Sequence, residues 1–161
     1  MRRNEQPQAG ASAAGLRVAI VASDYHREIH DRLLTGARAA FEQAGGSPSD
    51  LRITLIDGVY DLPAPVSEAI RQGVDAVVAL GCVVRGETRH DRHIVDAAFA
   101  TLAHLAATHR VPVALGILTV ETLKQARQRA GGEKGDAGAF AMRAAVRGVH
   151  ALRAMRKAGT P

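Results

Sequence analysis

Short apolar segments recur along the chain, and the stretches between them are long enough to hold a helix. Segment 16–23 is an unbroken apolar run of strand length, as expected for a strand buried on both faces of a sheet. Residues 51–57 instead alternate side chains with a period of two, which is typical of a half-buried strand. Two further runs, at 74–84 and 111–118, complete a set of four predicted strands.

Between the predicted strands, apolar residues recur at the spacing of an α-helix. In residues 29–44 apolar side chains recur every three or four positions, and Gly45-Gly46 then provides a C-terminal stop. Pro63 suits the first turn of a helix, and Thr119 has the side chain expected of an N-cap. The predicted helices cover residues 29–44, 63–72, 91–109, about 120–130, and a last segment whose apolar stripe is Met142, Val146, Val149, Leu152 and Met155.

Strands and helices therefore alternate as βαβαβαβαα, and each crossover is long enough for parallel pairing. This order predicts an α/β fold, a single-domain α/β/α sandwich around a four-stranded parallel sheet. The chain of 161 residues suffices for one domain with a substantial core. Residues 1–15, rich in Gln, Ala and Gly, are expected to form a flexible N-terminal arm, and residues 16–158 the domain itself.

Composition narrows the class of protein. Cys82 is the only cysteine, which excludes an intramolecular disulfide framework and fits a reducing compartment such as the cytoplasm. No apolar run is long enough to span a bilayer, and residues 1–10 lack the apolar core of a signal peptide, so we expect no membrane association. The formal net charge is +5, but basic runs are short and contain no aromatic residues, so we expect no nucleic-acid partner.

Polar and titratable side chains follow each predicted strand. In open parallel sheets ligands bind beyond the carboxyl ends of the strands, so these positions are expected to converge on one pocket. The strongest candidate for part of such a pocket is segment 81–90, GCVVRGETRH, which presents two glycines, two arginines and a histidine directly after an apolar strand. The others are Tyr25-His26, Tyr60-Asp61 and Leu118-Thr119. No dinucleotide-binding Gly-x-Gly-x-x-Gly and no Walker loop follows the first strand.

His90 is the leading catalytic candidate, because imidazole titrates near neutrality and can move protons in both directions. A solvated residue ahead of a helix is the competing interpretation. The spacing His90-x-x-His93-x-x-Asp96 also resembles a set of metal ligands, but no second ligand cluster accompanies it, so we expect no metal. Cys82 could be a nucleophile, although its place inside an apolar strand end favours an inert buried thiol.

Three cations are candidates for binding a phosphate: Arg85, Arg129 and Lys134. The planar fork of arginine matches phosphate oxygens. Arg129, at a predicted helix end, could equally be favoured there by the helix dipole. Tyr25 and Tyr60, two of only five aromatic residues, could each stack on a flat ligand, although Tyr60 could equally pack in the core.

Together these segments resemble the lumazine synthase family of riboflavin biosynthesis. The most specific are RGETRH at 85–90 and the glycine-rich loop from Arg129 to Gly138. Segment 20–45 resembles the family's opening strand and helix, and GVYDLP at 58–63 resembles its Gly-Ala-Phe-Glu-Ile/Val-Pro loop. The resemblance extends over all but the arm and the last few residues, and it implies a flavodoxin-like fold.

The resemblance implies a transferase that condenses 5-amino-6-(D-ribitylamino)uracil with 3,4-dihydroxy-2-butanone 4-phosphate. The products would be 6,7-dimethyl-8-ribityllumazine, phosphate and water. The family uses no metal and no organic cofactor. Imine formation, phosphate elimination, ring closure and dehydration all require positioning and proton transfer.

Carried over position by position, the resemblance makes His90 the proton donor and Tyr25 the residue that stacks on the pyrimidine ring. Arg129, helped by Glu87 and Thr88, would bind the phosphate of the butanone substrate. The rest of the pyrimidine and ribityl site would consist of Val59, Tyr60, Asp61, Cys82, Val83, Val84 and, at a position that a neighbouring subunit usually supplies, Leu115.

Some positions depart from the family's pattern. Leu115 stands where Phe is usual, Asp61 is one methylene shorter than the usual Glu, Asp91-Arg92 replaces an aromatic-Asp pair, and Ala137 replaces a Lys. These changes reduce ring and phosphate contacts, so they motivate an alternative: a paralogue that binds a lumazine or flavin, or builds a shell, without useful turnover. A general phosphate-binding α/β module is a third interpretation.

The resemblance also implies homopentamers with each active site at a subunit boundary. In many members twelve pentamers close into a hollow icosahedral capsid. Segment 131–138 carries no long insertion, which is compatible with such a shell. A closed ring of identical subunits would also bury a shared helix face of this Ala-rich domain.

Overall fold

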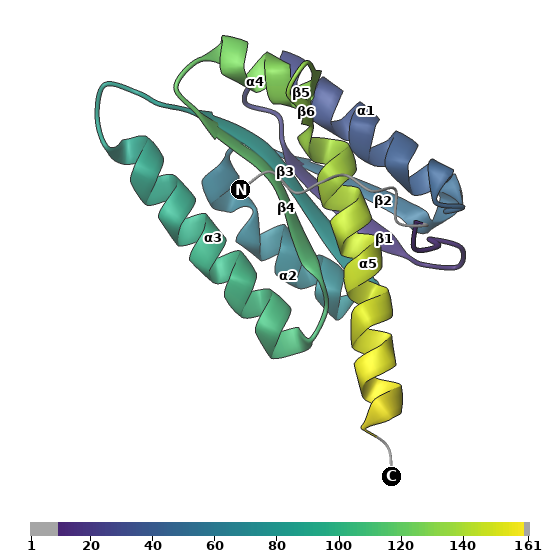
Figure 1. Ribbon diagram of the computed structural model, residues 1–161. Helices are drawn as coiled ribbons and strands as arrows, with labels where there is room; N and C mark the ends of the chain where they lie inside the picture. The colour runs from purple at the N-terminus through teal and green to yellow at the C-terminus, as the bar shows by residue number, and fades with distance from the viewer. Residues whose placement is uncertain (1–9, 160–161) are drawn as a thin grey trace.

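A parallel sheet forms the middle layer of the structure (Figure 1). The computed structural model describes residues 10–159. The four strands are β1 (Val18–Ser23), β2 (Leu51–Ile56), β3 (Ala76–Val84) and β4 (Val113–Val120). Their spatial order is β2-β1-β3-β4, and all three pairings are parallel, as the sequence predicts.

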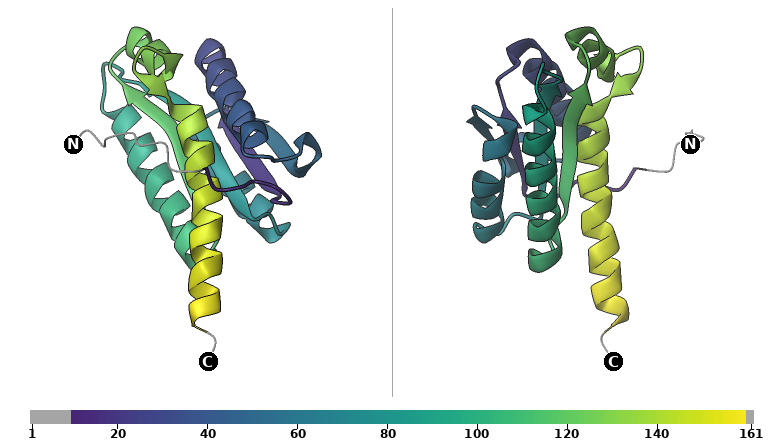
Figure 2. Two further views of the ribbon diagram at one scale, coloured as in Figure 1. Left: turned by 45° about the vertical axis from the view of Figure 1, so that its right-hand side comes forward. Right: turned by 90° about the vertical axis from the view of Figure 1, so that its left-hand side faces the viewer.

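Helices cover both faces of this sheet (Figure 2). They are α1 (Arg27–Gln43), α2 (Pro63–Arg71), α3 (His90–His109), α4 (Leu123–Arg129) and α5 (Ala137–Ala158). One apolar core joins α1 and α5 to the sheet, and a second joins α2 and α3 to the opposite face. The α/β/α sandwich is therefore confirmed. Within residues 10–159 no helix is long and apolar enough to cross a membrane.

The strands differ in burial between the centre of the sheet and its edge. Every residue of β1 is buried, which confirms the expectation drawn from its unbroken apolar run. The β2 strand differs, because Ile53 and Leu55 are exposed despite their alternating pattern. As an edge strand, β2 has a neighbour on one side only, so the adjoining helices cover it less completely.

The helices α1 and α5 approach each other closely at a glycine. A Cβ atom on Gly138 would collide with the backbone oxygen of Leu33 on α1. Close to this crossing, the Asp136 carboxylate caps α5 by accepting a hydrogen bond from the Ala139 N–H at 2.9 Å. Glycine therefore allows the backbones to touch where α5 begins.

The predicted start of α4 was wrong. Thr119 is a strand residue, because β4 continues to Val120 and pairs with β3 as far as Val84. The N-cap is Thr122, whose hydroxyl accepts a hydrogen bond from the Gln125 N–H at 3.3 Å. Both threonines have capping chemistry, and the longer strand pairing decides between them.

Packing begins ahead of the predicted domain boundary. Ala13 is fully buried, and its N–H donates to the Ala44 carbonyl at 2.8 Å. Ala11 also packs against the core shared by α1 and α5. The last residues of the expected arm thus belong to the folded domain, whereas positions 1–9 lie outside the described residues.

Candidate active site

A cleft of about 630 Å³ opens at the carboxyl edge of the sheet. We call it the imidazole cleft, because His26, His90 and His93 all line it. The segments after β1, β2 and β3 meet there, in the position where open parallel sheets bind ligands. Of the twelve predicted site residues, nine line this cleft: Tyr25, Val59, Tyr60, Asp61, Cys82, Val83, Val84, Thr88 and His90.

Two tyrosine rings stand at the mouth of the imidazole cleft. Tyr25 is 77% exposed and Tyr60 is 63% exposed, so neither packs in the core. Tyr25 makes one aromatic contact, an edge-to-face arrangement with His26 at 5.1 Å between ring centroids. Of the two interpretations that the sequence left open, the exposure of both rings favours a ligand-stacking surface.

The floor of the cleft comes from β3 and from the 3₁₀ turn Val59–Asp61. Val59 is buried and packs over Gly81, where a Cβ atom would lie only 2.7 Å from its Cγ2. Cys82 is 6% exposed, and this burial raises the pKa of its thiol to about 11. The thiol is therefore protonated at neutral pH, which favours the inert-thiol interpretation over a nucleophile.

His90 is the first residue of the long helix α3, and its side chain is exposed. Its backbone N–H lies 3.4 Å from the Thr88 hydroxyl oxygen, which accepts the hydrogen bond. This contact lies at the end of the loop ahead of α3, and His90 lines the cleft together with the turn that carries Tyr60. An accessible imidazole in this position can donate or accept a proton from a bound molecule.

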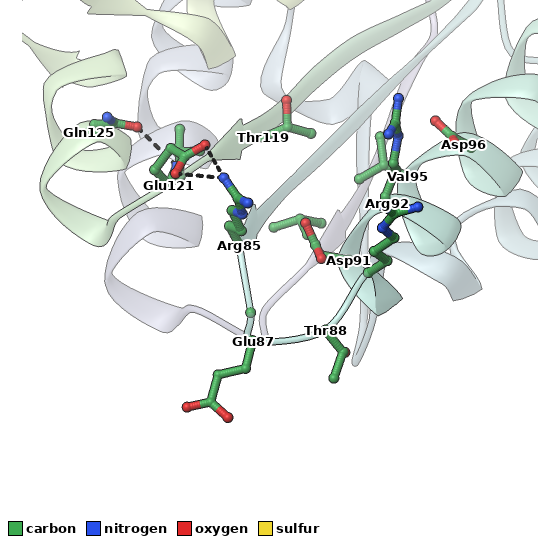
Figure 3. Close-up of a pocket in the computed structure, with 14 residues that line it drawn as sticks. Arg85, Glu87, Thr88, Asp91, Arg92, Val95, Asp96, Thr119, Glu121 and Gln125 are labelled. Atoms are coloured by element: carbon green, nitrogen blue, oxygen red, sulfur yellow. Dashed lines mark hydrogen bonds and ion pairs between the residues drawn. The ribbon is translucent and has the colours of Figure 1, made fainter.

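A second cleft, of about 720 Å³, lies on the other side of the same loop (Figure 3). We call it the arginine cleft, because Arg85, Arg89 and Arg92 line it. Glu87 belongs to this cleft alone, whereas Thr88 lines both. Thr119, at the end of β4, also lines the arginine cleft, so the prediction that all four strand ends share one pocket was wrong for this strand.

Arg85 does not offer a free guanidinium. Its Nη1 lies 3.1 and 3.2 Å from the two carboxylate oxygens of Glu121, across the ends of β3 and β4 (Figure 3). Its backbone N–H also donates to the Val120 carbonyl at 2.8 Å. This ion pair ties the loop to β4, and it makes Arg85 the weakest of the three phosphate candidates.

Two predicted site residues, Arg129 and Leu115, lie outside both clefts. Arg129 ends α4, and its Nη1 donates to the Gln125 carbonyl at 3.2 Å. Leu115 is 38% exposed and lies in the middle of the edge strand β4. The structure therefore does not bring Arg129 together with Glu87 and Thr88 within one copy of the chain.

The spacing of His90, His93 and Asp96 does not produce a cluster of metal ligands. Among residues 10–159 there is no group of three His, Cys, Asp or Glu side chains arranged to hold a metal ion. The members of the set do not share one cleft. His93 lines the imidazole cleft, whereas Asp96 lines the arginine cleft. No residue of this site is therefore assigned to a metal.

Residues without a role in the predicted site also line the imidazole cleft. His26 directly follows Tyr25, and His93 lies one helical turn after His90 on α3. The i, i+3 spacing on a helix was the available signal for His93, because such residues share a face. Asp91, where the family pattern has an aromatic residue, lines both clefts.

Comparison with known proteins shows the family to which the chain belongs. A family model described as 6,7-dimethyl-8-ribityllumazine synthase matches residues 15–153. A protein of that name from Kineococcus radiotolerans is 42% identical over 155 residues, which cover 95% of each chain. One from Thermus thermophilus is 35% identical and covers 91% of this chain and 94% of its own. One from Chlamydia muridarum is 35% identical over 136 residues, 83% of this chain and 87% of its own.

The matches cover the parts of the chain that form the fold and the clefts. The matched segment begins just before β1 and ends within α5, so it contains all the strands and both clefts. The chain belongs to the 6,7-dimethyl-8-ribityllumazine synthase family.

Proposed function

We propose that this protein condenses 5-amino-6-(D-ribitylamino)uracil with 3,4-dihydroxy-2-butanone 4-phosphate, giving 6,7-dimethyl-8-ribityllumazine, phosphate and water. One observation carries the proposal beyond family membership: an exposed aromatic ring, Tyr25, and an accessible imidazole, His90, line the same cleft. Its volume of about 630 Å³ suits a small ligand of this kind.

In this proposal the pyrimidine ring stacks on Tyr25. The backbone groups of Val83 and Val84, where β3 ends, bind its edge, and Asp61 reaches toward the ribityl chain. Cys82 forms part of the floor without taking part in chemistry, because its raised pKa keeps the thiol neutral. Such a site positions the amine for attack on the ketone.

His90 transfers protons in the proposed reaction. The amine and the ketone form an imine with loss of water, and loss of a proton from carbon then expels the phosphate. Attack by the second nitrogen closes the ring, and a final loss of water gives the product. Each step needs a proton moved to or from carbon, nitrogen or oxygen, and the two ring nitrogens of an imidazole can donate and accept protons. No step requires a metal or an organic cofactor.

The phosphate site is proposed to include a second copy of the chain. Arg129 and Leu115 lie outside both clefts of their own copy, Leu115 on the edge strand β4 and Arg129 at the end of α4. A homopentamer that presents these residues to the imidazole cleft of a neighbour would complete each site at a subunit boundary. The mass of a pentamer of 17.0 kDa chains is about 85 kDa. A 60-subunit capsid would be twelve times larger, so light scattering separates the two.

Incubation of the purified protein with both substrates tests the activity. We expect the absorbance and fluorescence of the lumazine product to grow with time, at a rate proportional to protein concentration. Tight binding of the product without turnover would instead favour a non-catalytic paralogue, the alternative that Asp61, Leu115 and Ala137 motivate. We assign the reaction to the cytoplasm, because the lone Cys82 suits a reducing compartment.

A further inference from the structure

One ion pair outside both clefts holds the helix that carries Arg129. On α1, the Glu28 carboxylate accepts hydrogen bonds from Arg127 Nε at 2.9 and 3.0 Å and from Arg127 Nη2 at 2.8 Å. This is the two-nitrogen geometry in which guanidinium and carboxylate groups bind most specifically. The pair joins residues 99 positions apart, so it links α4 directly to α1.

A second contact fixes the same residue. Arg32, one helical turn after Glu28 on α1, donates from Nη1 to the Arg127 carbonyl at 3.2 Å. The side chain and the main chain of Arg127 are therefore both held by one face of α1. These two polar contacts with α1 add to the packing of the buried Ala126 in orienting the last turn of α4.

The segment after α4 folds back on this turn. The Lys134 N–H donates to the Gln128 carbonyl at 2.8 Å, within the hairpin of β5 (Ala130–Gly132) and β6 (Gly135–Asp136). Gly132 leaves room for this, because a Cβ atom there would lie 2.6 Å from the Arg127 oxygen. The end of α4 and the hairpin thus form one unit, with α1 as its support.

We infer that the Glu28–Arg127 ion pair positions Arg129 for the phosphate of the butanone substrate, an inference that rests on the proposed function. Arg127 and Arg129 lie in the same last turn of α4, and Glu28 engages only the first of them. Within residues 10–159 no carboxylate pairs with Arg129, whose guanidinium is tied only to the Gln125 carbonyl. Glu28 therefore determines which arginine of this turn is left for an anion.

The surroundings of the pair fit a positioning role better than a stabilising one. The Arg127 and Glu28 side chains are 49% and 55% exposed, and exposed ion pairs contribute little to folding stability. The hydrogen bonds from Arg127 lower the pKa of Glu28, so the carboxylate remains charged at neutral pH. With Glu28 neutralised, Arg127 would be released beside Arg129, and α4 would lose one of the two polar contacts with α1 described above.

The chain offers a matched control on the opposite face of the sheet. On α2, Glu68 accepts two hydrogen bonds of 2.7 Å from Arg71, and both side chains are exposed. Here too a carboxylate binds the Nε and Nη2 atoms of an arginine, but the pair lies within one helix, and α2 packs in the core on the other face of the sheet from α1 and α4. Glu68→Gln therefore removes an equivalent ion pair without touching Arg129.

Steady-state kinetics of the full-length enzyme, with each substrate varied in turn, test the inference. We expect Glu28→Gln to raise the KM for the butanone phosphate about fivefold, with kcat and the KM for the pyrimidine little changed. Glu68→Gln should behave as the wild type. The double variant Glu28→Gln/Arg129→Ala should be no worse than Arg129→Ala alone, because Glu28 acts through Arg129.

The outcomes separate this inference from the proposed function. If Arg129→Ala raises the KM for the butanone phosphate and Glu28→Gln does not, the phosphate site stands and the positioning role is refuted. Equal increases in both KM values for Glu28→Gln, or additive losses in the double variant, would also refute it. If Arg129→Ala itself leaves the KM unchanged, then both the phosphate role of Arg129 and the inference built on it are wrong.

Discussion

Cys82 and His90 line the same cleft, yet their surroundings give them opposite chemical characters. The Cys82 thiol is buried in the sheet, so its ionised form is disfavoured. The His90 imidazole stands at the exposed start of α3, where it can exchange protons with a bound molecule or with solvent. The difference in burial supports the proposal that His90 carries out the acid–base chemistry, and two experiments test it.

Replacing His90 with Gln should lower kcat by about a hundredfold, because the proton transfers then depend on water. The thermal midpoint should change little, since the side chain is exposed and supports no core contact. His109→Gln, at the far end of the same helix, is the matched control and should leave kcat unaltered. Wild-type turnover in His90→Gln would remove this residue from the mechanism.

The raised pKa of Cys82 predicts a specific pH dependence of its alkylation. The reactive thiolate grows tenfold per pH unit below the pKa, which burial moves from 9.0 to about 11. Iodoacetamide should therefore react slowly at pH 8 and faster up to about pH 11, whereas the unfolded chain should reach its plateau roughly two units lower. A rate that levels off near pH 9 in the folded protein would contradict the assignment.

At the residue scale, the sequence predicted most of the residues that line the imidazole cleft. It did not predict that the polar residues at the strand ends would line two separate clefts. Tyr25, Tyr60 and His90 could be found because they directly follow or precede predicted elements at the carboxyl edge of the sheet. His93 could not be assigned a role, since its spacing fitted a metal ligand equally well. The pairing of Arg85 with Glu121 joins two strand ends, and no local pattern in the sequence reports it.

Among the elements, the crossing of α1 and α5 requires a glycine at position 138. The Gly138 backbone touches the backbone at Leu33, and α5 begins one residue earlier, just after the segment that connects it to α4. Any side chain at position 138 must push the two helices apart. Because helix α5 also packs on β3 and β4, the displacement would extend to the sheet.

Gly138→Ala should therefore destabilise the fold by about 1–3 kcal/mol, the usual range for overpacking a close contact. Chemical denaturation with urea measures this as a lower midpoint at an unchanged slope. Gly10→Ala provides the control, because no atom lies within 4 Å of a Cβ placed there. Equal stability of the two variants would show that the helices can separate without cost.

At the scale of elements, periodicity predicted the type and order of every long helix and strand. It failed where two patterns competed. Thr119 and Thr122 both suit an N-cap, and only the register of β4 against β3 selects the second. The alternation of residues 51–57 predicted a half-buried strand, but the exposure of Ile53 depends on β2 being at the edge, which is a property of the assembled sheet.

At the scale of the whole molecule, the position of Arg129 decides how many copies of the chain the proposed active site needs. The phosphate-binding arginine that the family pattern implies ends α4 and lines neither cleft of its own copy. If the proposed reaction occurs, the site must take His90 from one copy and Arg129 from another. A ring of identical subunits meets this requirement at every boundary.

Mixing two impaired variants tests this shared site most directly. His90→Gln and Arg129→Ala protein would be unfolded together in equal amounts, refolded and assayed at a butanone phosphate concentration well below the KM of Arg129→Ala. In a randomly mixed ring about one site in four joins a native His90 to a native Arg129 from its neighbour. We predict recovery of about a quarter of the wild-type rate after mixing, against only a small residual rate when each variant is refolded alone. Failure of the mixture to exceed the sum of the separate variants, in rings shown by mass to contain both, would contradict a site shared between subunits.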